Sequence, residues 1–433
     1  MSLFNQLRIN LGYDSMDSNN NPIPNFYNLD ITSNLELKKM TVDTLLDNTY
    51  GNFVSNSVDF FFENGEDFIY PIVLFESLLF TETTTIELSQ KVVDSIRKNK
   101  AKIVIFYLTE GFYGHWDCEY TWINNLVERY KFDKSQFIVV TSNLLAGKKE
   151  IDKNFTIYPY PFFLNHISFF WKIQKFHPST GAYFKDHRDF LLDNIEKNKE
   201  YHFLCFNAIP KLHRLLVFSE FLTNPEYKDK FILTMGKTES DIEKNFYEIV
   251  KNGTQEYTIE NKDTILDFFE KYDSRNERIY DRINLAENGK INGGSINIEV
   301  QRKCFVNVVT ETLWDIDNCV FFTEKTLKPI YTCQPFIIVG NPYTLKKLKD
   351  YGFQTFSRWW DESYDEETDE SKRIEKIFKV MRDISIWDKD KCRETLVEMN
   401  ETLKHNFRIL FTTTELKKLY SFLKTHDDDI KII

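Results

Sequence analysis

Glycine is scarce in this sequence, and cysteines never occur in pairs. Only 14 of the 433 residues are glycine, against 39 Phe and 22 Tyr. The six cysteines are scattered singly, with no C-x-x-C spacing. Isolated thiols argue against a disulfide framework and a structural zinc site, and they favour reduced thiols in a cytoplasmic setting.

Long apolar runs and an excess of positive charge are also lacking. No stretch of 18 apolar residues occurs, and no basic segment leads into an apolar run at the N-terminus, so we expect neither a membrane span nor a classical secretion signal. Lys and Arg number 55 and Asp and Glu 66, which gives a net charge of −11. An acidic chain lacks the broad positive field of nucleic-acid-binding proteins, so nucleic acid is disfavoured as a partner, although a local basic groove is allowed.

Several motifs of common enzyme classes are absent. The sequence has no G-x-S-x-G, no Walker A and no G-x-G-x-x-G, which argues against a serine hydrolase, a P-loop enzyme and a conventional dinucleotide dehydrogenase. His166, His177 and His187 are spaced too widely to share one helical turn as metal ligands. Asp315 and Asp317 form a D-x-D triplet in a polar turn rather than at a strand end, so we expect no metal there.

The composition and the order of apolar runs predict an α/β protein. Apolar residues make up 42% and charged residues 28%, which is typical of a packed chain. At roughly 150 residues per domain, the length predicts two or three domains. Short apolar runs alternate with amphipathic stretches, as in parallel sheets. The expected strands are 72–80, 101–108, 137–141, 201–206, 231–235, 304–309 and 335–340, and helices are expected at 88–98, at 120–129 and through the last ~60 residues.

Prolines and charge divide the chain. Pro159, Pro161 and Pro178 precede the charged stretch 185–200, where we place the interdomain connection. We therefore predict an N-terminal domain at 1–195, a C-terminal domain at 196–400 and a helical tail at 401–433. Because open parallel sheets bind ligands at the carboxyl ends of their strands, we expect both domains to line a cleft.

Thr323, Glu324 and Lys325 stand at the start of an expected helix. A helix N-terminus favours an anion, and a lysine there adds a point charge suited to phosphate. Glutamate is the residue type that accepts hydrogen bonds from ribose hydroxyls. The alternative is that Glu324 is an ordinary surface charge offset by Lys325 or Lys328.

A second basic turn follows the expected strand 201–206, with the sequence NAIPKLHR. A strand end, basic side chains and a helix N-terminus converge at such a turn, which suits a diphosphate. The candidate residues are Asn207, Lys211, His213 and Arg214. The alternative for Arg214 is an ion pair with Glu220 or a contact that caps a carbonyl.

The segment 309–364 resembles the C-terminal half of a glycosyltransferase-like group common in phages and bacteria, which is distantly similar to the α-1,3-fucosyltransferases. The residues that carry the resemblance are Phe321 and Phe322 before T-E-K, the stretch 334–342 (QPFIIVGNP), Tyr351 to Phe353, Thr355, Phe356 and the stretch 360–365 (WDESYD). The turn N-x-x-P-x-x-H-R is also similar, except at Ala208 and Ile209. The resemblance implies a GT-B fold, in which two Rossmann-like domains face each other across a cleft. It also implies that Glu324 binds the ribose and Lys325 the pyrophosphate of a nucleotide sugar.

A transfer to a hydroxyl group also needs a base that takes the hydroxyl proton. Glu110 follows the expected strand 101–108 in a T-E-G turn that is similar to the Thr-Gly-Glu turn of fucosyltransferases, with Gly and Glu exchanged. His115 and Asp117 are rival candidates, and the alternative role of Asp117 is a helix cap. Glu76 is a weaker candidate.

The sequence is thus interpreted as a cytoplasmic glycosyltransferase that moves a sugar from a nucleoside diphosphate sugar to a hydroxyl of a glycan or other acceptor. No cofactor or metal is expected beside the nucleotide sugar. If a phage or virus encodes the chain, the location is the host cytoplasm. The alternatives are a transferase that modifies hydroxylated bases of phage DNA, and a non-catalytic interaction protein that retains the fold.

Overall fold

The computed structural model describes residues 9–23, 53–74, 87–108, 118–147, 155–165, 191, 199–207, 211–235, 296, 298–315, 318–412 and 414–428. The chain divides into two compact units. Unit 1 comprises 1–166, 316–321 and 413–433, and unit 2 comprises 167–315 and 322–412. Each unit thus combines segments that are distant in the sequence, and the domain bounds expected from the sequence stay a prediction.

Unit 1 contains a six-stranded sheet in the order β4-β1-β5-β6-β7-β8, in which every pairing is parallel. The strands are β1 (Ile9–Tyr13), β4 (Phe53–Ser57), β5 (Phe68–Leu74), β6 (Ala101–Tyr107), β7 (Phe137–Thr141) and β8 (Thr156–Pro159). A small antiparallel ribbon pairs β2 (Ser15–Met16) with β3 (Pro22–Ile23). The expected strands 101–108 and 137–141 are confirmed. The expected strand 72–80 corresponds to β5, which begins four residues earlier, and residues 75–80 lie outside the described residues.

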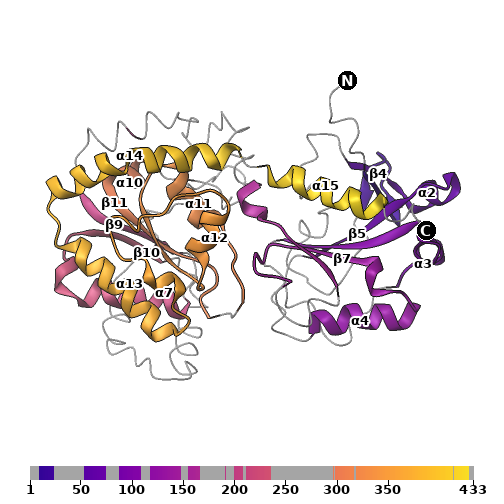
Figure 1. Ribbon diagram of the computed structural model, residues 1–433, viewed down its shortest axis with the longest axis horizontal. Helices are drawn as coiled ribbons and strands as arrows, with labels where there is room; N and C mark the ends of the chain where they lie inside the picture. Colours follow the sequence, from indigo (N-terminus) through magenta and orange to yellow (C-terminus); the bar gives the residue numbers. More distant parts are fainter. Residues whose placement is uncertain are drawn as a thin grey trace. The chain divides into compact units, whose positions relative to one another are not determined.

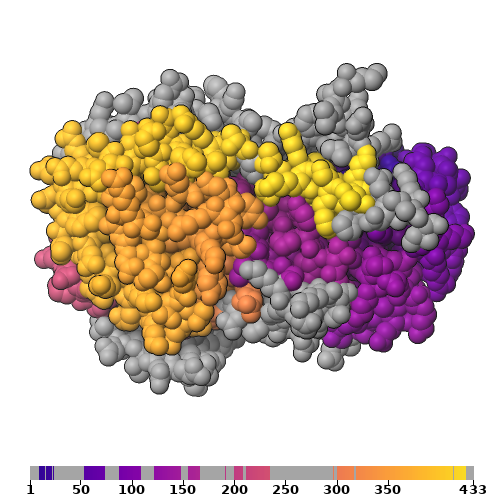
Figure 2. Space-filling view, in the orientation of Figure 1, coloured from indigo at the N-terminus to yellow at the C-terminus, as the bar shows by residue number. Residues whose placement is uncertain are grey.

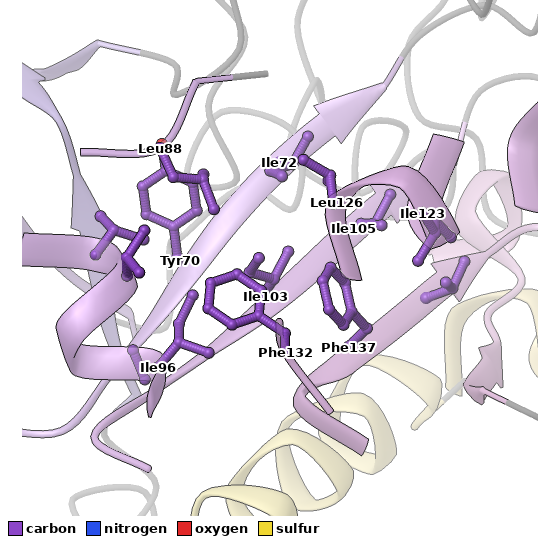
Figure 3. Packing of buried hydrophobic residues seen from close by; sticks show 14 of the residues in the cluster. Tyr70, Ile72, Leu88, Ile96, Ile103, Ile105, Ile123, Leu126, Phe132 and Phe137 are labelled. Atoms are coloured by element: carbon purple, nitrogen blue, oxygen red, sulfur yellow. The ribbon is translucent and has the colours of Figure 1, made fainter. Parts of the chain in front are cut away.

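Helices cover both faces of the unit 1 sheet (Figure 1). They are α2 (Val58–Asn64), α3 (Gln90–Arg97), α4 (Cys118–Tyr130), a 3₁₀ turn at Lys134–Gln136 and α15 (Glu415–Asp428). Along β6, Ile103 and Ile105 pack with α3 and α4, as Figure 3 shows, while Val104 and Phe106 pack on the opposite face with residues of α15. Both sets are buried because successive strand side chains point to opposite faces, and each face is covered.

Unit 2 contains a four-stranded parallel sheet in the order β10-β9-β11-β12. The strands are β9 (Tyr201–Asn207), β10 (Phe231–Met235), β11 (Cys304–Thr310) and β12 (Phe336–Val339). The four strands expected in this part of the chain are confirmed to within a residue or so at each end.

The helices of unit 2 lie on both sides of its sheet (Figure 1). They are α7 (Leu212–Thr223), α10 (Ile298–Lys303), α11 (Glu324–Tyr331), α12 (Thr344–Asp350), α13 (Glu370–Ser385) and α14 (Lys389–Thr412), with 3₁₀ turns at Pro225–Tyr227 and Ser363–Glu366. Helix α14 packs against α11, where the rings of Tyr331 and Phe407 stack at 5.9 Å. Figure 2 shows the yellow atoms of α14 beside the orange segment of the same unit. The helical C-terminal region is therefore confirmed, and no helix among the described residues is long and apolar enough to span a bilayer.

Candidate functional site

The two basic turns predicted from the sequence belong to neighbouring strands of unit 2. Strands β9 and β11 are paired in parallel, so their carboxyl ends meet at one edge of the sheet. Asn207, the last residue of β9, accepts a hydrogen bond at Oδ1 from the hydroxyl of Thr310, the last residue of β11. Both side chains are buried, so this bond fixes the two strand ends relative to each other.

Two lysines from the two turns converge on Thr312. Lys211 Nζ donates to the carbonyl oxygen of Thr312 at 2.8 Å, and Lys325 Nζ donates to its hydroxyl at 3.2 Å. Two like charges held at one residue repel each other, and an anion placed between them would relieve that repulsion. The structure therefore brings together the lysines that the sequence pointed to separately.

The N-terminus of α11 is formed by the T-E-K motif. Thr323 is the N-cap residue, and its hydroxyl accepts hydrogen bonds from the backbone N–H and the Nζ of Lys325, both at 3.3 Å. This cap satisfies a donor that would otherwise be free at the helix end. The remaining N-terminal N–H groups and the Lys325 ammonium group are the features that favour an anion.

Glu324 forms an ion pair with Lys325, with 3.3 Å between Oε1 and Nζ. Burial acts to raise the pKa of Glu324, but the charges of Lys325 and Lys328 together with hydrogen bonds to the carboxylate lower the pKa below its ordinary value. The side chain keeps 19% of its surface exposed. Glu324 is thus an accessible acceptor of hydrogen bonds, and it also makes the pairing with Lys325 that was the alternative to ribose binding.

Arg214 and His213 are buried at the start of α7, with 3% and 2% of their surfaces exposed. Both donate to the carbonyl oxygen of Glu311, His213 from Nε2 at 2.9 Å and Arg214 from a terminal nitrogen at 3.3 Å. Burial and then the charge of Arg214 lower the pKa of His213 well below its ordinary value. The His213 ring is therefore neutral, with its proton on Nε2, and the positive charge of this turn resides on Arg214 and Lys211.

The alternative partner for Arg214 is occupied elsewhere. Glu220 Oε1 pairs with Arg382 at 3.0 Å, while Arg214 contacts the Glu311 carbonyl, as the capping alternative expected. Burial lowers the pKa of Arg214 from its ordinary value, and the charges of Glu311 and Glu324 act in the opposite direction. The positive charge of the Arg214 guanidinium group therefore interacts with the negative charges of Glu311 and Glu324.

Glu311 is the residue of this site that the sequence interpretation missed. It directly follows β11, and its side chain is buried, with 2% exposed. Its two carboxyl oxygens accept four hydrogen bonds, two from backbone N–H groups and two from hydroxyls, as follows: Thr312 N (3.1 Å), Thr323 N (3.1 Å), Thr323 Oγ1 (2.7 Å) and Thr326 Oγ1 (2.5 Å). A carboxylate directly after a buried strand was the signal that selected Glu110, and the same signal is present at Glu311.

Trp314 packs between His213 and Arg373. Its ring stacks on His213, with 5.8 Å between centroids and an interplanar angle of 15°, and the Arg373 guanidinium lies 4.1 Å from its centroid. Arg373 also donates to the Trp314 carbonyl oxygen at 2.6 Å. This arrangement connects α7, the segment after β11 and α13.

The acidic run 361–370 contains two buried carboxyl groups, those of Glu362 and Asp365. Asp365 accepts hydrogen bonds from the backbone N–H groups of Leu345 (2.7 Å) and Lys346 (2.9 Å), and Glu362 accepts from Phe356 N at 2.7 Å. Trp360 and Asp365 are among the residues that line a pocket of about 410 Å³. The two buried carboxylates thus organise the chain around α12.

The candidates for the catalytic base are not positioned by the structure. Glu110, His115 and Asp117, together with Glu76, lie outside the described residues. So do Asp317 of the D-x-D triplet and the three histidines at 166, 177 and 187. In the described part of the chain, no group of three His, Cys, Asp or Glu side chains is arranged to hold a metal ion.

Comparison with known proteins gives no family for this chain. No family model and no curated protein matches it. Among solved structures, the N-terminal domain of trehalose-6-phosphate phosphatase from Candida albicans is similar with a TM-score of 0.42 and 11% identity, over 85% of this chain and 72% of that one. The α,α-trehalose 6-phosphate synthase from Burkholderia multivorans is similar with a TM-score of 0.36 and 10% identity, over 85% and 74%. Likenesses of this strength identify neither a family nor an activity.

Proposed function

We propose that unit 2 binds the diphosphate of a nucleotide sugar and that the protein is a glycosyltransferase of the GT-B type. The observation that carries the proposal is the convergence of Lys211 and Lys325 on Thr312. Both lysines lie at the carboxyl edge of a parallel sheet, which is where α/β sheets bind their ligands. Arg214 adds a third positive charge to the same cluster.

The site residues suit the parts of such a donor. The Lys325 side chain is partly exposed, with 25% of its surface accessible. Its ammonium group lies beside the N-terminus of α11 and can bind phosphate oxygens directly. The partly exposed Glu324 carboxylate can accept hydrogen bonds from the ribose hydroxyls. Asn207 and His213 hold the strand end and the α7 turn in place from buried positions, and Thr323 caps α11.

The chemistry is a substitution at the anomeric carbon of the sugar. A bond forms between the acceptor hydroxyl oxygen and that carbon, while the bond between the carbon and the diphosphate oxygen breaks, and the electron pair leaves with the nucleoside diphosphate. Lys211, Lys325 and Arg214 stabilise the negative charge that develops on the leaving group. If the reaction inverts the anomeric configuration, a base takes the hydroxyl proton, and Glu110, His115 and Asp117 are the candidates. No step in this scheme requires a metal.

Binding of nucleoside diphosphates tests this function. We expect one of UDP, GDP, ADP and CDP to raise the melting temperature, since a ligand at 100 times its Kd adds about 2.7 kcal/mol of stability. Lys325→Ala should bind that nucleotide at least about tenfold more weakly, in line with the loss of a charge-assisted hydrogen bond. Lys372→Ala is the matched control because that side chain is 71% exposed on α13.

Other outcomes would assign the protein differently. If Lys325→Ala binds the nucleotide as tightly as the parent, the phosphate assignment is wrong. If no nucleoside diphosphate binds and no nucleotide sugar is consumed, the protein is a non-catalytic member of this fold. A shift of duplex DNA in a gel at low salt would indicate a DNA acceptor, and its absence would exclude one.

A further inference from the structure

Glu311 has more polar contacts than any role in donor binding explains. Its carboxyl group accepts four hydrogen bonds while its backbone carbonyl accepts from His213 and Arg214. Glu311 therefore connects the first turn of α7, the end of β11 and the N-terminus of α11. With 2% of its surface exposed, it does not reach a ligand itself.

A chain of hydrogen bonds runs from Glu311 to the Lys325 ammonium group. The Thr323 hydroxyl donates its single proton to Glu311 Oε2 at 2.7 Å. With that proton committed, the same oxygen presents its lone pairs to Lys325, and it accepts from Lys325 Nζ at 3.3 Å. The Thr323 backbone N–H donates to the other carboxyl oxygen at 3.1 Å, which fixes the residue at both its backbone and its side chain.

We propose that Glu311 is a positioning residue that acts through Thr323 to hold Lys325 where the donor diphosphate binds. This inference rests on the proposed function for the identity of the ligand. The orientation of Lys325 follows from the contacts alone. Preorganised positive groups bind an anion more tightly than mobile ones because less side-chain freedom is lost on binding.

The contacts require a carboxylate rather than an amide at this position. Thr323 N donates to Oε1 and Thr312 N donates to Oε2, so both oxygens face a backbone N–H group. Glutamine has one acceptor oxygen and one NH₂ group. In either orientation its NH₂ group would face one of these N–H donors, and Thr323 or Thr312 would have to move.

Glycine at position 340 fits the same arrangement. A Cβ atom at Gly340 would lie 3.2 Å from Glu311 Cβ and 3.6 Å from its Cγ. The backbone after β12 therefore passes directly against the Glu311 side chain. This close approach limits the positions open to Glu311 and helps to keep its carboxyl group aimed at α11.

Two measurements on the full chain test the proposal. The first is the acetylation rate of Lys325 relative to Lys372 under a limiting pulse of acetic anhydride, read by mass spectrometry. The second is the affinity for inorganic pyrophosphate, measured by calorimetry. We expect Glu311→Gln to raise the relative rate at Lys325 about fivefold, consistent with the loss of one hydrogen bond, and to weaken pyrophosphate binding about tenfold.

Thr326→Val is the matched control. It removes one hydrogen bond from the same carboxyl group at 2.5 Å and leaves both Thr323 contacts in place. We expect it to lower the melting temperature while the acetylation ratio and the pyrophosphate affinity stay within about twofold of the parent, since the loss is one buried hydrogen bond.

The outcomes separate this proposal from the proposed function. If the parent does not bind pyrophosphate, the donor site fails, and the acetylation ratio alone decides the role of Glu311. If Glu311→Gln folds and both readouts match the parent, the positioning role is wrong. The same holds if Thr326→Val changes the ratio as much as Glu311→Gln. Should Glu311→Gln not fold, Glu311→Asp, which retracts both oxygens by one methylene, is compared with Thr326→Val by the same criteria.

Discussion

Lys211 and Lys325 lie more than a hundred residues apart in the sequence, and their ammonium groups donate to the same residue, Thr312, at 2.8 and 3.2 Å. One comes from the turn before α7 and the other from the first turn of α11. Parallel pairing of β9 with β11 brings the ends of both strands, and the segments that follow them, to the same edge of the sheet. The proposed diphosphate site is the consequence of that pairing.

Lys211→Met tests the contribution of the first lysine. We expect about tenfold weaker pyrophosphate binding, because an ammonium group that faces the anion is lost. Lys230→Met is the matched control, since Lys230 Nζ also donates to a backbone carbonyl at 2.8 Å, that of Ser385, but precedes β10 at the opposite end of the sheet. Calorimetry of both variants decides the point, and equal losses would show that only general stability has changed.

Gly340→Ala should destabilise the protein by about 1–3 kcal/mol, the usual cost of overpacking. The new Cβ would lie 3.2 Å from Glu311 Cβ and 3.3 Å from Ile338 Cγ2. Without this crowding, the loss of backbone freedom in the unfolded chain would stabilise the variant by roughly 0.4–1 kcal/mol. Urea unfolding measures both the sign and the size of the change in unfolding free energy. A variant more stable than the parent would show that Glu311 and Ile338 shift to accommodate the new Cβ atom.

Arg373→Met should cost about 3 kcal/mol or more in unfolding free energy, because three backbone carbonyls lose a buried charged donor. These are the carbonyl oxygens of Trp314 (2.6 Å), Glu367 (3.0 Å) and Thr368 (3.3 Å). Arg358→Met is the control, because Arg358 also lies over a tryptophan, Trp359, at 5.6 Å, but it is exposed. Its cost should stay within about 0.5 kcal/mol. If Arg373→Met and Arg358→Met lost similar amounts of unfolding free energy, the three hydrogen bonds of Arg373 to backbone carbonyls would not be the cause.

Asp365 gives stability a pH dependence. Burial raises the pKa of its carboxyl group to about 6, against 3.8 for an ordinary aspartate, although the N–H groups of Leu345 and Lys346 oppose the rise. The folded state therefore binds this proton more tightly than the unfolded state does. Its stabilising contribution is complete below pH ~4 and is lost as the pH rises through 6, with a size on the order of 3 kcal/mol.

Asp365→Asn removes the titrating carboxyl group. The unfolding free energy of the variant should therefore fall less than that of the parent between pH 4 and pH 6. Urea unfolding at pH 4, 5, 6 and 7 measures the difference between the two proteins. Parallel curves would show that Asp365 does not titrate in this range. The variant also loses one of the two acceptor oxygens that cap α12, which shifts its curve downward equally at all pH values.

The strands that the sequence revealed are those with continuous apolar runs. Segments such as 101–108 and 304–309 are buried on both faces, and burial of this kind requires Val, Ile and Phe at successive positions. The strands β1 and β4 escaped notice because INLGY and FVSNS are short and contain Asn, Gly and Ser, which have low strand propensity. Tertiary pairing places β1 between β4 and β5.

The proposed donor site was predicted as two separate turns and without Glu311. The T-E-K and NAIPKLHR segments are recognisable because their charges stand next to apolar runs. Glu311 has the same setting after β11, but its role depends on Thr323 and Thr326, which are 12 and 15 positions further along the chain. The sequence interpretation counted His213 among the basic residues of its turn. Burial, which only the tertiary structure reveals, lowers the pKa of His213 and keeps its ring neutral.

By itself, the sequence determined the α/β class, two parallel sheets, a helical C-terminal region and the residue types that suit a diphosphate, because apolar periodicity and local charge are written along the chain. Only the tertiary structure decided which of those residues meet. Strand pairing set β9 beside β11, and this pairing placed Lys211, Glu311 and Lys325 in one cluster. Burial then decided which of the charged side chains are enclosed, such as Glu311 and Arg214, and which stay partly exposed, such as Glu324 and Lys325.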